Sequence, residues 1–174
     1  MRRLLLLLVV TSLAWPWPET AFAQDGAAVP TRLTIPGIQL DAAITAVGWL
    51  NTPRGAAWQV PDHAVGWHRT SAMPGQAGNL VLTGHHNIKG KVFRRLKELA
   101  VGDTLTIYAG ETAFDYVVTE RLILRELGLP SAQRLANARW IGPFPHERVT
   151  LVTCYPDWAN THRLIVVARP VAPP

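Results

Sequence analysis

Residues 150–167 read TLVTCYPDWANTHRLIVV and carry the densest pattern in the sequence. Apolar and β-branched residues lead up to Cys154, Pro156 cannot continue a paired strand, and a second run of the same kind begins at Arg163. This pattern predicts two adjacent antiparallel strands joined by a short loop. In that arrangement, Cys154 and Arg163 lie close together in space.

Side chains alternate across a strand, so Cys154 and Arg163 are expected to point away from the side chains that flank them. The residues expected on the opposite face are Val149, Leu151, Thr153, Leu164 and Val166. Because Val152, Ile165 and Val167 are apolar as well, alternation alone leaves open which face is the core.

A cysteine beside an arginine suits a nucleophile, because the thiolate is the reactive species and a fixed cation favours it. Arginine keeps its proton at every working pH, so Arg163 could also donate to an oxyanion forming on an acyl carbon. Two structural interpretations stay open. Arg163 could simply begin a strand at the surface, and Cys154 could be a buried, inert thiol.

A thiol nucleophile also needs a base or an ion-pair partner, for which histidine is the usual choice. The candidates are His63, His68, His85, His86, His146 and His162. His85 is best placed, because it follows the strand-like run Asn79–Thr83 and a glycine that permits close backbone approach. A zinc site is disfavoured, since His85 and His86 point apart on an extended chain and there is no second thiol.

The rest of the chain consists of short strand-like runs bounded by glycine, proline, asparagine or aspartate. The expected strands are Arg32–Ile35, Ile38–Val47, Leu80–Thr83, Thr104–Tyr108, Ala113–Leu124, Val149–Thr153 and Arg163–Ala168. A hairpin turn is expected at Ala109-Gly110-Glu111, and helical spacing occurs at Lys91–Ala100. We therefore expect a mainly antiparallel β domain with one short helix, built as a barrel or a sandwich.

Residues 1–23 have the features of a signal peptide: two arginines, an apolar run and a small-x-small cleavage site at Ala21-Phe22-Ala23. The apolar run is shorter than the ~20 residues that a spanning helix needs, so cleavage is favoured over retention as a membrane anchor. Residues 24–31 are expected to form a linker, and residues 32–174 the folded domain. The protein is thus expected at the extracytoplasmic cell surface, with membrane association through an uncleaved signal as the alternative.

The cysteine count and the net charge restrict the possible functions. Cys154 is the only cysteine, so the chain cannot form an internal disulfide. An exported free thiol is either buried and inert or kept for its reactivity. The formal net charge of +5 is scattered, with no basic block or aromatic-interleaved stripe, so nucleic acid is not an expected partner.

The combined pattern resembles the sortases, surface transpeptidases found mainly in Gram-positive bacteria. The matching segments are Thr83-Gly84-His85, Leu151-Val152-Thr153-Cys154 and Asn160-Thr161-His162-Arg163-Leu164. The resemblance extends from about Arg32 to Val171. No Asp-Pro pair precedes the barrel, which separates the chain from the lid-bearing, pilin-polymerising sortases.

The resemblance implies a closed eight-stranded β-barrel with one or two short helices. Sortases cleave an LPXTG-like sorting motif between threonine and glycine, hold the acyl part as a thioester, and pass it to an amine. Cys154 would be the nucleophile, His85 the proton donor to the leaving amine, and Arg163 the oxyanion stabiliser. The implied substrate-binding residues are Thr83, Thr153 and Asn160.

The implied partners are surface proteins with a C-terminal sorting motif and a cell-wall precursor or other amine acceptor. No metal or organic cofactor is implied, and no acidic cluster resembles a calcium loop. Residues 126–147 occupy the loop that helps to select the sorting motif in the family, or else form only a long surface connection. His86 and His162 are not assigned catalytic roles: each could tune the Cys154–His85 pair electrostatically or be only a polar residue of the groove.

Two other functions stay open on sequence grounds. A cysteine endopeptidase of similar geometry would release the acyl group to water instead of to an amine. A noncatalytic envelope-binding β-barrel would keep Cys154 as a structural residue that resists alkylation.

Overall fold

The computed structural model describes residues 28–52 and 55–171. The predicted signal peptide, residues 1–23, lies outside the described residues. The strands of the main sheet are β1 (Arg32–Ile35), β2 (Leu40–Val47), β5 (Val65–His68), β6 (Asn79–Thr83), β7 (Thr104–Ala109), β8 (Thr112–Arg125), β9 (Arg148–Tyr155) and β10 (His162–Pro170). A separate hairpin consists of β3 (Trp49–Thr52) and β4 (Gly55–Trp58).

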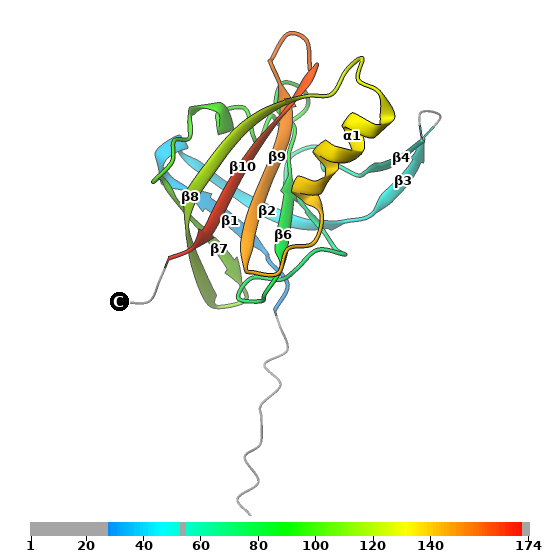
Figure 1. The fold of residues 1–174 in the computed structure, drawn as a ribbon. Helices are drawn as coiled ribbons and strands as arrows, with labels where there is room; N and C mark the ends of the chain where they lie inside the picture. The colour runs from blue at the N-terminus through cyan, green and yellow to red at the C-terminus, as the bar shows by residue number, and fades with distance from the viewer. Residues whose placement is uncertain (1–27, 53–54, 172–174) are drawn as a thin grey trace, which may run out of the picture.

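The main sheet closes into a barrel with the strand order β1-β2-β5-β6-β9-β10-β8-β7 (Figure 1). Closure pairs both edges of every barrel strand, which confirms the predicted eight-stranded closed barrel. Most neighbours are antiparallel, but β2–β5 and β6–β9 are parallel pairs. A parallel pair needs a long crossover, and residues 84–147 supply it between β6 and β9.

Alternating side chains of the barrel strands fill the core. Fully buried core residues include Leu33, Ile35, Leu82, Ile107, Leu151, Leu164 and Val166. The predicted hairpin turn is confirmed, because β7 ends at Ala109, β8 begins at Thr112, and Gly110 has a φ of 60°. The short strand β5 and the β3–β4 hairpin were not predicted.

The predicted helix at Lys91–Ala100 is wrong. This segment forms consecutive turns and the short 3₁₀ helix η2 (Leu96–Glu98). Lys91 has a φ of 52°, which an α-helix cannot include, and the Phe93 N–H donates to the His85 carbonyl at 3.0 Å. The turns still bury Phe93 and Leu96, so the apolar spacing reflects packing onto the barrel.

The α-helix of the structure lies instead in the crossover between β8 and β9. Helix α1 (Ser131–Ala138) is followed by the 3₁₀ helix η3 (Arg139–Ile141). No α1 residue is buried, and Leu135 is exposed, so this helix packs no apolar side chain into the core. Within residues 28–52 and 55–171, no helix is long and apolar enough to cross a membrane.

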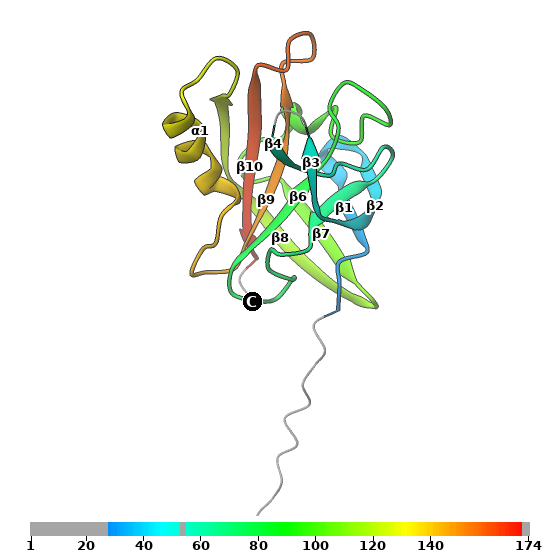
Figure 2. The same cartoon turned by 90° about the vertical axis from the view of Figure 1, so that its right-hand side faces the viewer.

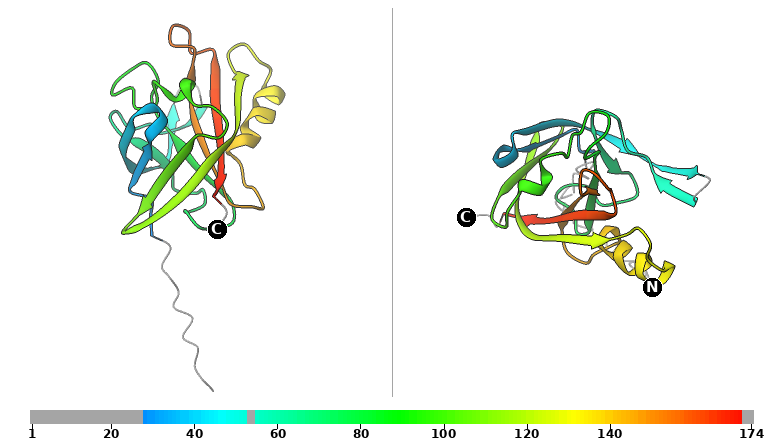
Figure 3. Two further views of the ribbon diagram at one scale, coloured as in Figure 1. Left: turned by 90° about the vertical axis from the view of Figure 1, so that its left-hand side faces the viewer. Right: turned by 90° about the horizontal axis from the view of Figure 1, so that it is seen from above.

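The β3–β4 hairpin and α1 extend from the same side of the barrel (Figure 3). Between them lies a cavity of about 730 Å³. Its lining includes Trp49 and Trp58 of the hairpin and Ile141 and Phe144 of the crossover. The indole of Trp58 stacks on the buried His68 ring, with centroids 3.8 Å apart.

A buried arginine fastens the crossover to the barrel. Arg148 is 2% exposed and donates to the Trp140 carbonyl oxygen at 2.8 Å, to Thr150 Oγ1 at 3.1 Å and to Asn79 Oδ1 at 3.2 Å. Its guanidinium carbon lies 3.4 Å from the centroid of the Phe144 ring. Burial lowers the pKa of Arg148 to about 10, which leaves it charged at neutral pH.

Candidate active site

Three neighbouring strands present His85, Cys154 and Arg163 in one row. Cys154 and Arg163 are directly paired residues of β9 and β10. Thr83 and Val152 are paired in β6 and β9, and His85 and Cys154 each lie two residues beyond that pair. The Gly84 N–H also donates to the Val152 carbonyl at 3.3 Å, which extends the alignment past the end of β6. Figure 2 shows these three strands side by side.

The predicted side-chain faces of β9 and β10 are confirmed. The residues predicted on the inner face are all buried: Val149, Leu151, Thr153, Leu164 and Val166. All of them except Thr153 belong to the main hydrophobic core. Cys154 and Arg163 alternate with them and are half-buried on the outer face.

The outer face also explains the apolar residues that left the orientation open. Val152 and Ile165 line a cavity of about 170 Å³ together with Arg163. The rest of its lining comes from β8 and the crossover: Leu124, Glu126, Arg134, Asn137, Ala138 and Ile141. The outer face near Arg163 therefore carries a groove beside α1, whereas Val167, further along β10, is fully buried.

The guanidinium of Arg163 makes few polar contacts with the described residues. Its Nη1 donates to the His162 carbonyl at 3.2 Å, and it forms no ion pair with the residues that the structure describes. Since a guanidinium has five N–H donors, most of them are available to a bound group in the groove.

His85 is half-buried, and its Nε2 is buried without a hydrogen-bond partner among residues 28–52 and 55–171. Burial of the ring and the nearby Lys89 ammonium lower the pKa of His85, while a hydrogen bond to the Val60 backbone and the Asp62 carboxylate oppose that shift. Lys89 and Asp62 form an ion pair of 2.6 Å at the surface. Within the described part of the chain, Nε2 therefore keeps a hydrogen-bonding capacity that no protein group uses.

The two other histidines near the row do not line the groove. His86 is 1% exposed and pairs with Asp157 in the β9–β10 loop. His162 alternates with Arg163, and its Nδ1 lies 2.8 Å from Thr161 Oγ1. The interpretation of both as polar groove residues is therefore wrong for His86 and lacks support for His162.

The three implied substrate-binding residues differ in their surroundings. Thr153 is buried and donates to the Gly84 carbonyl at 2.7 Å, and Thr83 is buried with its hydroxyl 3.4 Å from the Gly66 carbonyl. Asn160 is exposed and has a φ of 53°, a left-handed conformation that asparagine tolerates. Substrate binding by these residues stays a prediction.

Sequence reasoning missed the charged residues around the row. Asp157, Lys97, Lys89 and Asp62 come from four separate segments that only the folded barrel brings together. No spacing pattern connects them, so no signal in the sequence could have found them. Among the described residues, no group of three or more His, Cys, Asp or Glu side chains is arranged to hold a metal ion.

The closed eight-stranded barrel carries a histidine, a cysteine and an arginine at the ends of three neighbouring strands. A family model described as "Sortase domain" matches residues 33–171, and the chain therefore belongs to the sortase family.

Known relatives agree with this assignment. Sortase SrtE1 of Streptomyces coelicolor is 31% identical over 110 residues, which are 58% of this chain and 29% of that protein. The chain thus spans less than a third of that relative. A lid mutant of sortase A from Corynebacterium diphtheriae superimposes with a TM-score of 0.65 at 25% identity, covering 84% of this chain and 72% of that chain. Sortase C-1 from Actinomyces oris shares the fold, with a TM-score of 0.64 at 24% identity over 82% of this chain and 73% of that chain.

Proposed function

We propose that the protein is a sortase-type transpeptidase of the cell surface. It cleaves an LPXTG-like sorting motif through a thioacyl-enzyme and transfers the carboxyl-terminal threonine of the cleaved protein to an amine of the cell envelope. The observation that carries the proposal is the row of His85, Cys154 and Arg163 across β6, β9 and β10. A thiol, an imidazole and a cation on neighbouring strand ends are the groups that amide exchange requires.

In the first half-reaction, the Cys154 thiolate attacks the carbonyl carbon of the scissile bond. Arg163 donates hydrogen bonds to the resulting oxyanion. His85 then gives its proton to the departing amine as the C–N bond breaks, which leaves a thioester on Cys154. The unpaired guanidinium donors of Arg163 and the alignment of the His85 segment with the Cys154 strand support these roles.

In the second half-reaction, the incoming amine attacks the thioester carbonyl and loses a proton to His85. The C–S bond breaks, the thiolate returns, and a new amide bond links the cleaved protein to the acceptor. The lowered pKa of His85 makes its protonated form a stronger acid but reduces the protonated fraction at neutral pH. The stronger acid speeds proton transfer, and the smaller protonated fraction slows the reaction.

The test is intact-mass spectrometry of residues 24–174 incubated with LPXTG-like peptides, with and without a glycine-based amine. We expect an acyl adduct on the wild type that the amine discharges, and none on Cys154→Ala. His85→Ala and Arg163→Ala should each reduce turnover severely, since each removes a group that acts in the transition state.

The outcomes separate the proposal from its alternatives. An adduct that water discharges as fast as the amine does would identify an endopeptidase. No adduct with any peptide, combined with a Cys154 thiol that resists alkylation at neutral pH, would identify a noncatalytic binding barrel. Wild-type turnover in any of the three variants would remove that residue from the mechanism.

A further inference from the structure

A buried histidine follows His85 and points away from the groove. His86 is 1% exposed, and its Nε2 contacts a carboxylate oxygen of Asp157. Because an ionised carboxylate only accepts hydrogen bonds, Nε2 is the donor. The other ring nitrogen, Nδ1, lies 3.4 Å from the Phe93 carbonyl oxygen. The His86 ring is therefore held on two sides.

Asp157 belongs to the loop that connects Cys154 to Arg163. Its carboxylate binds His86, and its backbone carbonyl accepts a hydrogen bond from Asn87 Nδ2. The two residues that follow His85 therefore both contact Asp157. Through these contacts, Asp157 joins the segment that carries His85 to the loop between Cys154 and Arg163.

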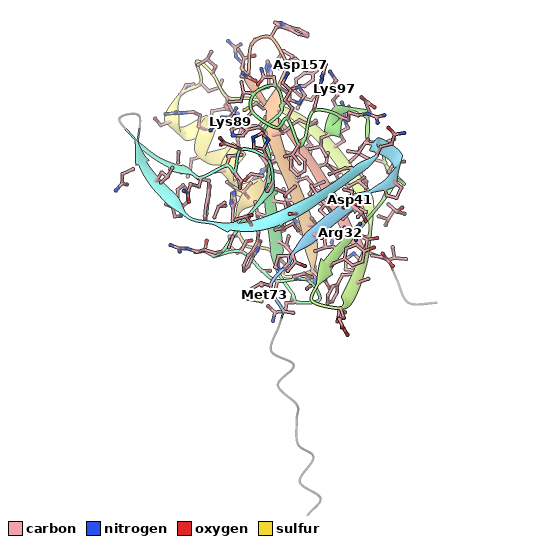
Figure 4. The ribbon with its side chains drawn as sticks, turned by 180° about the vertical axis from the view of Figure 1, so that it is seen from behind. Arg32, Asp41, Met73, Lys89, Lys97 and Asp157 are labelled. Atoms are coloured by element: carbon pink, nitrogen blue, oxygen red, sulfur yellow. The ribbon has the colours of Figure 1, made fainter. Side chains whose placement is uncertain are left out.

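Lys97 is a third partner of Asp157 and stabilises its ionised carboxylate. Lys97 Nζ lies 3.2 Å and 3.1 Å from the two carboxylate oxygens. Hydrogen bonds from His86 and Lys97 lower the pKa of Asp157 to about 2, so the carboxylate is ionised at any pH suitable for an assay. Figure 4 shows Asp157, Lys97 and Lys89 at the same end of the barrel.

We propose that Asp157 is a positioning residue for acyl transfer, whose carboxylate fixes the placement of His85 relative to Cys154 through His86. It acts through His86, whose buried ring binds the Asp157 carboxylate. The proposal rests on the transpeptidase function inferred above. A catalytic group that shifts by about 1 Å can lose on the order of 10²-fold in rate, so a change in this contact should appear in turnover.

The experiment compares Asp157→Ala and Asp157→Asn with Asp41→Ala in steady-state transfer of a sorting peptide. Asp41 is a matched control, because it is also a carboxylate in an ion pair, with Arg32 on β1 and β2. We expect Asp157→Ala to lower kcat about tenfold or more with KM nearly unchanged, and Asp157→Asn to fall between it and the wild type. An unchanged kcat in a folded Asp157→Asn protein overturns the proposal, as does a loss confined to KM.

A second measurement does not require turnover. The rate at which iodoacetamide alkylates Cys154 is recorded against pH, and the inflection that disappears in His85→Ala is assigned to His85. Asp157→Asn should displace or weaken that inflection, whereas Asp41→Ala should not. An inflection unchanged in Asp157→Asn overturns the positioning role. A wild type that shows the inflection but forms no acyl adduct with any peptide overturns the transpeptidase function instead.

Discussion

The Thr153 hydroxyl donates a hydrogen bond of 2.7 Å to the carbonyl oxygen of Gly84. These residues immediately precede Cys154 and His85, so this single contact ties together the backbones that carry the nucleophile and the proposed acid. Both partners are on the buried side of the chain, where water cannot replace the donor.

Thr153→Val should loosen this link while preserving the shape of the side chain. We expect a loss of about 1 kcal/mol in the free energy of unfolding and a fall of several-fold in kcat. Urea unfolding and steady-state transfer measure the two effects. Thr153→Ser keeps the hydroxyl and should retain most of the activity; an equal loss of kcat in both variants would show that the methyl group, and not the hydrogen bond, is what matters.

The Lys89–Asp62 pair should set the alkaline limit of activity. The Lys89 charge lowers the pKa of His85 because it disfavours the imidazolium, and the Asp62 charge acts in the opposite sense. If His85 works as the acid, Lys89→Met should move the alkaline limb of the kcat/KM profile to higher pH, and Asp62→Asn should move it to lower pH. Shifts in the same direction for both variants would contradict this assignment.

His68 should make the barrel sensitive to acid. The residue is 2% exposed, and its Nε2 has no partner among the residues that the structure describes. Burial lowers the pKa of His68 from 6.5 to about 4. Below pH 6.5 His68 is protonated in the unfolded chain but stays neutral in the folded protein. The free energy of unfolding therefore falls as the pH decreases toward about 4. The loss over this window should be on the order of 3 kcal/mol.

Denaturant unfolding between pH 7 and pH 4 measures this loss. His68→Phe retains a ring to stack on Trp58 and should remove this part of the pH dependence. The exposed His146 is the control, and His146→Phe should leave the dependence intact. A His68→Phe protein with the same acid-induced loss as the wild type would assign the effect to other groups.

Arg148 should be essential to the wall that α1 and η3 form beside the groove. Lysine cannot reproduce the three hydrogen-bonded contacts of the guanidinium or its planar packing on Phe144. Arg148→Lys should therefore cost about 2 kcal/mol of stability and raise KM for the sorting peptide more than it lowers kcat. The exposed Arg169 gives the matched control, Arg169→Lys. Equal thermal midpoints for the two variants would refute the anchoring role.

The parts of the site that could be predicted are those determined locally. Pro156 ends a strand, the run after Arg163 begins another, and a short loop leaves the two strands few ways to pair, so the Cys154–Arg163 pair followed from the sequence. The position of His85 followed from Gly84 and the strand before it. The closed eight-stranded barrel depended on the resemblance to a family, because strand patterns alone also allow a sandwich.

The remaining features depend on contacts that no local pattern encodes. The four residues of β5 are all buried, so its run shows no alternation to identify it as a strand. The turns at residues 91–100 satisfy the same apolar spacing as a helix, and only the positive φ of Lys91 distinguishes them. Asp157 meets His86 across 71 positions of the sequence, which places that pair beyond any motif.

The parallel pairing of β6 with β9 has a consequence for how the enzyme matures. Arg163 reaches Cys154 through a short hairpin, which can close in microseconds, but the contact that brings the histidine segment beside the cysteine strand spans 69 positions. Long-range parallel contacts form late, because the entropy of closing the loop must be lost first. We therefore expect a refolding chain to carry an unactivated thiol until the barrel closes, which pulsed alkylation during refolding can follow. The reactivity of Cys154 would then report completion of the whole barrel and not of its own hairpin.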